Sequence, residues 1–177
     1  MILYQQDKLS VRVLQKDDAE LLVRWLSDPK VLEYYEGRDN AHDLDKVREH
    51  FYREDEATRC IVQYEEIDIG YIQFYPVLEE ERRLYGYTDR QETLYGMDQF
   101  IGETQFWNTG IGTKLVASMR DYLMRRGVDA IVMDPQAWNH RALRCYEKCG
   151  FVKMKMLPSH ERHEGEMRDC WLIEYRK

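Results

Sequence analysis

The most informative stretch of this chain reads Phe106-Trp107-Asn108-Thr109-Gly110-Ile111-Gly112-Thr113-Lys114-Leu115. A strand-like run at residues 94–101 precedes it and a helical run at residues 113–126 follows it, so the two glycines lie where a loop becomes a helix. At a helix N-terminus the backbone N–H groups lack intrahelical partners and the helix dipole is positive, which suits a phosphate. A tight strand–helix connection without a ligand explains a lone glycine turn equally well.

Two familiar phosphate-binding loops do not fit this stretch. A dinucleotide-binding fingerprint requires a third small residue after Gly110 and Gly112, and Leu115 occupies that position. A P-loop requires a glycine five residues before Gly112, where the chain has Trp107. A phosphate bound here would therefore belong to another family of folds.

The composition is that of a single globular domain covering residues 1–177. Hydrophobic residues make up 44% of the chain and charged residues 33%, and no apolar run approaches the ~18 residues that a membrane helix needs. The N-terminal residues lack the basic and apolar regions of a signal peptide. We therefore expect no membrane partner.

The charge and the cysteines restrict the compartment and the partners. The formal net charge is −7, and the isoelectric point lies near 5.3. This balance disfavours nucleic acid and is compatible with a cationic small molecule. The four cysteines show no CxxC spacing, which favours reduced thiols in a cytoplasmic protein.

Hydrophobic periodicity predicts alternating strands and helices along the chain. The strand, glycine turn, helix and strand at residues 94–133 form a predicted β-α-β unit with parallel strand pairing. A helix is expected between an Asp17/Glu20 capping box and the Asp28-Pro29 pair, and Asn139 is expected to open the last helix. Residues 65–68 are predicted to join a hairpin, and residues 79–92 to form a solvated excursion. The remaining predicted elements are strands at residues 9–14, 60–64, 69–75, 94–101, 128–133, 151–154 and 170–175, and helices at residues 44–52, 113–126 and 139–148.

Three groups of polar residues admit a structural or a functional interpretation. Asp98 interrupts an apolar strand just before the glycine turn; it either faces solvent or accepts a proton near neutrality. The loop at residues 34–39 either packs on the core or lines a site for an amine. Residues 160–164 imitate a metal cluster but follow Pro158 in what is expected to be a charged loop, so no metal is expected. Cys145 and Cys149 are interpreted as packing residues.

The order of elements, together with two motifs, resembles the GNAT acetyltransferases over essentially the whole chain. The motifs are Gly110-Ile111-Gly112 and Asn139-x-x-Ala142-x-x-x-Tyr146-x-x-x-Gly150-Phe151. The resemblance implies a mixed α/β (α+β) GNAT fold in the order β-α-α-β-β-β-α-β-α-β-β. Its central twisted mixed sheet would have about seven strands and helices on both faces. It also implies acetyl-CoA as the cosubstrate.

The resemblance implies which residues hold acetyl-CoA. The glycine turn is similar to the family's pyrophosphate loop, although Trp107 stands where many members have Gln or Arg. Tyr146 matches a tyrosine that acts as general acid beside the CoA sulfur. The implied cofactor-binding residues are Phe100, Ile101, Trp107, Asn108, Thr109, Gly110, Ile111, Gly112, Thr113, Asn139, Ala142 and Tyr146.

A narrower set of motifs resembles the aminoglycoside 6′-N-acetyltransferases. These motifs are Gly70-Tyr71-x-Gln73, Tyr95-Gly96-Met97-Asp98-Gln99-Phe100-Ile101-Gly102, Trp107-x-x-Gly110-Ile111-Gly112-Thr113, Asp134-Pro135, His163-Glu164-Gly165 and Asp169-Cys170. The likeness implies Asp98 as the catalytic base. With Tyr146 as the general acid, these are the two implied catalytic residues. The implied substrate-binding residues are Tyr35, Glu36, Gln73, Asp98, Gln99 and Asp134.

These residues are consistent with direct transfer of an acetyl group in a ternary complex. Carboxylates complement an ammonium-rich aminoglycoside, and one of them can take the proton that the reacting amine must lose. Two alternatives remain open: a GNAT enzyme for another amine, such as a polyamine or a peptide N-terminus, and a module that binds acyl-CoA without turnover. Either a monomer or a homodimer is compatible with the sequence.

Overall fold

The computed structural model describes all 177 residues. The chain forms two compact units, each built from separate stretches of sequence. Unit 1 consists of Met1–Gln73, Gln99–Gly112 and His163–Glu166, and unit 2 consists of Phe74–Asp98, Thr113–Arg162 and Met167–Lys177. None of the helices combines the length and the apolar character that a membrane crossing requires.

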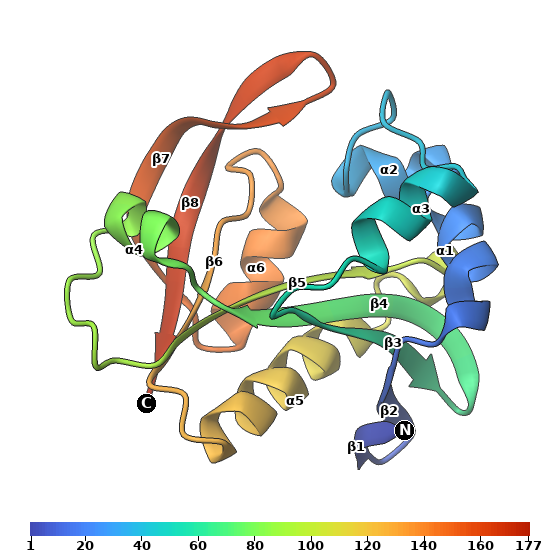
Figure 1. Ribbon diagram of the computed structural model, residues 1–177, viewed down its shortest axis with the longest axis horizontal. Coiled ribbons are helices and arrows are strands. Elements are labelled where there is room, and N and C mark those ends of the chain that lie inside the picture. Colours follow the sequence, from blue (N-terminus) through green and yellow to red (C-terminus); the bar gives the residue numbers. More distant parts are fainter. The chain divides into compact units, whose positions relative to one another are not determined.

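Eight strands and six α-helices make up the fold (Figure 1). The strands are β1 (Ile2–Gln6), β2 (Leu9–Val13), β3 (Thr58–Tyr64), β4 (Ile67–Pro76), β5 (Leu94–Ile101), β6 (Ala130–Met133), β7 (Val152–His163) and β8 (Glu166–Arg176). The helices are α1 (Ala19–Trp25), α2 (Pro29–Tyr34), α3 (Leu44–Phe51), α4 (Glu79–Tyr85), α5 (Ile111–Arg125) and α6 (His140–Lys148), and short 3₁₀ turns lie at Lys16–Asp18 and Thr104–Phe106.

The sheet is mixed, with the strand order β1-β2-β3-β4-β5-β6-β8-β7. β5 and β6 run parallel, with Leu94 opposite Ala130, which confirms the predicted β-α-β unit around the glycine turn. β1, β2 and β3 are antiparallel, as are β6 and β8. The mixed α/β class is confirmed, and the sheet has eight strands where about seven were predicted.

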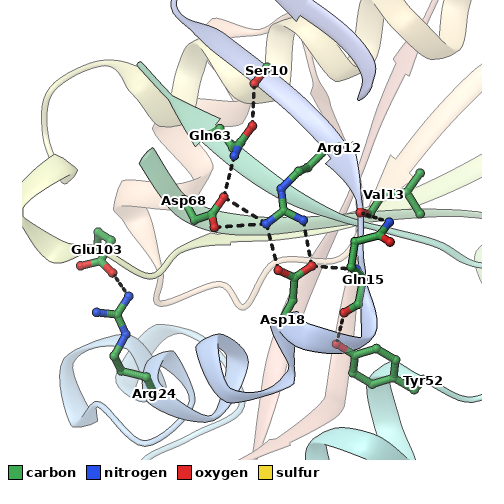
Figure 2. Close-up of polar contacts among 10 residues, drawn as sticks. All are labelled: Ser10, Arg12, Val13, Gln15, Asp18, Arg24, Tyr52, Gln63, Asp68 and Glu103. Carbon is green, nitrogen blue, oxygen red and sulfur yellow. Dashed lines mark hydrogen bonds and ion pairs between the residues drawn. The ribbon is translucent and has the colours of Figure 1, made fainter. Parts of the chain in front are cut away.

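The start of α1 differs from the prediction. Asp17 and Glu20 form no capping box, and the N-cap residue Asp18 makes no side-chain cap. The carboxylate of Asp18 instead accepts hydrogen bonds of 2.8 and 2.9 Å from Arg12, whose guanidinium also reaches Asp68 (Figure 2). A half-buried guanidinium requires such partners. The carboxylate of Asp18 also accepts a 2.7 Å bond from the Gln15 N–H at the 3₁₀ turn before α1, so its oxygens are used there and not at the first turn of α1.

Asp28-Pro29 ends no helix, although the sequence predicted that it would. α1 has already finished at Trp25, and the pair opens α2: Asp28 is the N-cap, accepts a 3.0 Å bond from the Lys30 N–H, and is followed by proline in the first turn. This is the favourable place for proline in a helix, because its missing N–H is not needed there. Together with α1 and α3, α2 belongs to unit 1 (Figure 1).

The predicted excursion at residues 79–92 contains a helix, α4. The sequence showed no period there because α4 buries none of its residues. Its charge order explains its stability: three glutamates occupy the first turn, arginines occupy the last, and Gly86 closes it with φ of +88°. The missed helix carries Tyr85, which donates a hydrogen bond to Asp134, and Glu81, which lies near the same carboxylate.

Each unit has its own apolar core. The core of unit 1 consists of Ala19, Leu22, Trp25, Leu26, Val31, Leu32, Val47, Phe51, Ile61, Tyr71 and Phe100. A core cluster of unit 2 consists of Val77, Leu94, Ala130, Val132, Leu157, Cys170 and Leu172. The strands that carry the predicted site residues are thus anchored from within each unit.

Candidate active site

The loop before the glycines is held by its own hydrogen bonds in unit 1. The indole Nε1 of Trp107 donates to the carbonyl of Ile101 at 2.8 Å, and the hydroxyl of Thr109 donates to the carbonyl of Phe106 at 2.5 Å. Asn108 and Gly110 adopt left-handed backbone conformations, with φ of +59° and +85°. The loop therefore has a defined shape without help from a ligand.

The two glycines leave their backbone open. A Cβ atom built on Gly110 or on Gly112 would meet no atom within 4 Å. Gly110 needs glycine for its positive φ, whereas Gly112 lies in α5 and has neither a positive φ nor a crowding neighbour. Free space beside unpaired N–H groups at the start of a helix is the geometry that an anionic group requires.

An aromatic cluster in unit 1 brings three predicted site residues together. The ring of Phe100 lies 4.6 Å from that of Tyr35 and 5.6 Å from that of Tyr71, measured between centroids. The hydroxyl of Tyr71 donates to Oε1 of Gln73 at 2.8 Å. Glu36 lies apart from this cluster: it is exposed, has φ of +73°, and accepts a bond from Asn40.

Asp98 lies on β5 in unit 2, half-buried, with Tyr75 of β4 as a hydrogen-bonding partner. Burial and the charge of Asp98 raise the pKa of the Tyr75 hydroxyl, which therefore stays protonated and donates to the carboxylate. Gly96 makes room for the tyrosine, since a Cβ there would lie 2.5 Å from the ring. The Gly96-Met97-Asp98 motif thus seats Tyr75 beside Asp98.

Asp134 directly follows β6 in unit 2 and has two partners on other elements. Its Oδ2 accepts a 3.1 Å bond from the Tyr85 hydroxyl of α4 and lies 2.8 Å from Nε2 of His160. His160 belongs to β7, so the expectation of a charged loop at residues 160–164 is wrong for residues 160–163. Burial and the charge of Asp134 also raise the pKa of nearby Glu81.

α6 presents Asn139 and Tyr146 in unit 2. The helix starts close to the predicted residue: Asn139 is its N-cap, and its Oδ1 accepts a 3.2 Å bond from the Ala142 N–H. Tyr146 is half-buried, with its ring 6.4 Å from that of Phe151 in an edge-on arrangement. Asn139 and Ala142 are therefore joined to each other by the helix cap.

The thiols of α6 lie beside the start of α5. The hydroxyl of Thr113 lies 3.5 Å from Sγ of Cys145, and the Cys149 thiol donates to the Thr113 carbonyl at 3.4 Å. Hydrogen bonding to Cys149, assisted by Thr113, lowers the pKa of the Cys145 thiol to about 7. All four cysteines are free, and no group of three or more His, Cys, Asp or Glu side chains is arranged to hold a metal.

The structure groups the predicted site residues into two sets. Unit 1 holds Tyr35, Glu36, Gln73, Gln99, Phe100, Ile101 and the loop from Trp107 to Gly112, and unit 2 holds Asp98, Thr113, Asp134, Asn139, Ala142 and Tyr146. Sequence reasoning missed the partners of the two aspartates, which are Tyr75, Glu81, Tyr85 and His160. No local sequence pattern identifies these four residues as partners, because each lies on a different segment from the aspartate with which it interacts.

Comparison with protein families identifies the chain's relatives. The GNAT acetyltransferase domain model matches residues 15–158. Aminoglycoside N(6′)-acetyltransferase type 1 from Klebsiella pneumoniae is 29% identical over 155 residues, which cover 83% of this chain and 75% of that protein. The enzyme of the same name from Serratia marcescens matches with the same values.

Solved structures share the fold. AAC(6′)-Ib in complex with ribostamycin and coenzyme A aligns with a TM-score of 0.77 and 25% identity, over 97% of this chain and 94% of that one. The spermidine N-acetyltransferase from Vibrio cholerae, in complex with CoA and spermine, aligns with a TM-score of 0.76 at 16% identity, over 97% and 96%. Because the family model spans most of its length, this chain belongs to the GNAT acetyltransferases, enzymes that take their acetyl group from acetyl-CoA.

Proposed function

We propose that this chain acetylates the 6′-amine of aminoglycoside antibiotics, by direct transfer from acetyl-CoA in a ternary complex, and is able to confer resistance to them. The observation that carries the proposal is the set of carboxylates in unit 2. Asp98 and Asp134 are each held by a tyrosine hydroxyl, and Glu81 lies close enough to Asp134 for its pKa to be raised by that charge.

Such a set suits a substrate with several ammonium groups. Carboxylates that are half-buried and fixed by hydrogen bonds attract cations more strongly than mobile surface carboxylates do. The net charge of −7 adds long-range attraction for a cationic substrate. The named relatives from Klebsiella pneumoniae and Serratia marcescens, both aminoglycoside N(6′)-acetyltransferases, support the same class of acceptor.

The glycine turn supports acetyl-CoA as the donor. A glycine inside a helix costs roughly 0.5–1 kcal/mol relative to alanine, and the chain's own packing gives no reason for Gly112. A phosphate that must approach the backbone closely is a reason for glycine at position 112. The pyrophosphate of acetyl-CoA would be held by backbone amides from Trp107 to Thr113, and its arm by Asn139, Ala142 and Tyr146.

The proposed chemistry needs a base and an acid. Asp98, directly or through one water, takes the proton that the 6′-ammonium must lose before it attacks the thioester. Backbone amides near Phe100 and Ile101 polarise the thioester carbonyl, and Tyr146 returns a proton to the departing thiolate. Tyr35, Glu36, Gln73, Gln99 and Asp134 contact the acceptor in this proposal. Cys145 is not needed as an acyl acceptor, since it belongs to the helix that holds the CoA arm.

The test is the release of free thiol from acetyl-CoA, with kanamycin, spermidine and a short peptide as separate acceptors. Release with kanamycin alone supports the proposal. Release only with spermidine or the peptide keeps the acetyltransferase and replaces its substrate. Silence with all three amines, alongside measurable binding of CoA, would contradict acetylation of an aminoglycoside and favour a binding module.

A further inference from the structure

Asp134 already carries a cation-like partner in the absence of a substrate. The Nε2 atom of His160 lies 2.8 Å from Asp134 Oδ2, and the side chains are only 18% and 32% exposed. Tyr85 donates to the same oxygen at 3.1 Å. An imidazolium at this distance from a carboxylate makes the charge-assisted contact that an acceptor ammonium would make.

The surroundings favour the protonated form of His160. Its pKa is raised, chiefly by the hydrogen bond to Asp134, against the opposing effect of burial, with smaller contributions from Glu161 and Glu81. The titratable groups around the pair come from five elements: Glu81 and Tyr85 of α4, Glu161 of β7, Tyr75 of β4, Asp98 of β5 and Cys170 of β8. None of them adds a positive charge, so His160 is the cation of this cluster.

Tyr85 and His160 differ in how they respond to pH. Burial and the charge of Asp134 raise the pKa of the Tyr85 hydroxyl, so it donates to the carboxylate at any physiological pH. His160 loses its charge within the accessible pH range, because an ordinary imidazole titrates near pH 6.5. Tyr85 is thus a constant partner that orients the carboxylate, and His160 is a partner whose charge can be removed.

We propose that His160 competes with the acceptor amine for Asp134: the imidazolium holds the carboxylate while the site is empty, and an acceptor ammonium displaces it. This inference rests on the proposed function, in which Asp134 binds the acceptor. Protonation of His160 neutralises part of the negative charge that attracts the substrate. The contact between His160 and Asp134 must also be broken when the substrate binds. Acceptor affinity should therefore rise as pH increases through the pKa of His160.

Linkage makes the effect reciprocal. If protonated His160 weakens the binding of the acceptor by some factor, then the bound acceptor lowers the protonation constant of His160 by the same factor. At a pH between the pKa values of His160 in the free and the acceptor-bound protein, binding of the acceptor must therefore expel a proton from His160. This provides a measurement that does not depend on turnover.

The first experiment titrates the histidine ring signals of the whole protein by NMR, in the wild type and in Asp134→Asn. His160→Gln assigns the signal. A His160 pKa that is above the ordinary value of an imidazole in the wild type, and that falls in Asp134→Asn, is expected. The same His160 pKa in both proteins would overturn the inference, whether or not any acceptor is acetylated.

The second experiment measures the KM for kanamycin at pH 6 and pH 8.5 in the wild type, His160→Gln and His50→Gln. The KM at pH 6 divided by the KM at pH 8.5 should be about threefold to tenfold larger in the wild type and in His50→Gln than in His160→Gln, since the competing contact is a single hydrogen bond. The substrate's own amines titrate equally in all three proteins and cancel. Equal ratios would overturn the competition.

The two proposals can fail separately. If kanamycin is not turned over and does not bind, the proposed function fails and the competition fails with it. The NMR titration still shows, in that case, whether His160 is paired with Asp134. If kanamycin is acetylated but its binding expels no proton that His160→Gln abolishes, the function stands and the competition is overturned. Calorimetry in two buffers of different ionisation enthalpy measures that proton.

Discussion

The indole Nε1 of Trp107 donates a 2.8 Å hydrogen bond to the backbone carbonyl of Ile101. This bond ties the start of the glycine turn to the last residue of β5, within unit 1. The Trp107 ring also meets Tyr34 edge-on at 5.8 Å and packs against the core of that unit. A residue that departs from the usual opening of the GNAT loop thus has a structural task of its own.

Trp107→Phe should lower the free energy of unfolding by about 1 kcal/mol, because it keeps an aromatic ring and removes the donor. It should also raise the KM for acetyl-CoA, since the loop loses its tie to β5. Urea denaturation and initial rates check the two effects. Trp171→Phe, which removes an indole outside the loop, serves as the control. A variant with wild-type stability would show that the bond contributes nothing.

Gly112→Ala should have opposite effects on stability and on binding. Alanine is better than glycine by roughly 0.5–1 kcal/mol in the middle of a helix and by less in the first turn, where Gly112 lies. The new Cβ meets no atom of the chain within 4 Å, so the protein should become slightly more stable. The Cβ would obstruct a phosphate at the backbone and weaken acetyl-CoA binding by about tenfold to hundredfold. Thermal melts and calorimetric titration measure both. Unchanged affinity would favour a purely structural turn.

Asp98→Asn should lower kcat by about 10² to 10⁴, because the amide cannot accept the proton of the reacting ammonium. The amide oxygen can still accept the bond from Tyr75, and acetyl-CoA affinity should stay close to that of the wild type. Asp134→Asn is the matched control, for which we expect a higher acceptor KM and a smaller loss of kcat. Turnover unaltered in Asp98→Asn would remove Asp98 from the mechanism.

An element of the fold could be predicted from the sequence where residues close together in the chain determine it. The glycine turn, the parallel pairing of β5 with β6 and the start of the last helix near Asn139 were predictable, because each depends on residues close together in the chain. α4 was not, since a helix without buried residues shows no apolar period. β1 was not either, because its residues are exposed or half-buried and carry no clear alternation.

The candidate site shows the same division. The aspartates stood out in sequence because a carboxylate beside an apolar strand is unusual. Their partners did not: Tyr85 lies 49 residues before Asp134 and His160 lies 26 residues after it. The partners of Arg12 divide in the same way, since Asp18 lies six residues away in the chain and Asp68 lies 56 residues away.

His42 makes the stability of unit 1 sensitive to acid. The ring is 1% exposed, and Nδ1 lies 2.8 Å from the carbonyl of Asn40, so that nitrogen carries the proton. The other ring nitrogen, Nε2, is buried without a partner, and burial lowers the pKa of His42. The imidazole of His42 is therefore neutral in the folded protein.

The sign of the effect follows from proton linkage. The unfolded chain binds more protons than the folded one at pH values below about 6.5, so the free energy of unfolding should fall as pH drops through that range. Urea denaturation at pH 5 and pH 8 measures the fall. His42→Gln, which cannot titrate, should show a smaller difference between the two pH values. An equal difference would mean that His42 does not control the acid response.

The central claim is acetylation of a 6′-amine, and a matched pair of antibiotics tests it most directly. Neomycin and paromomycin differ only at the 6′ position, where neomycin has an amine and paromomycin a hydroxyl. The measurement is free-thiol release from acetyl-CoA with each at equal concentration, with the product mass determined. We predict rapid release and a singly acetylated product with neomycin, and only background release with paromomycin. Equal rates with both antibiotics would contradict the account, because the acetyl group would then go to another position.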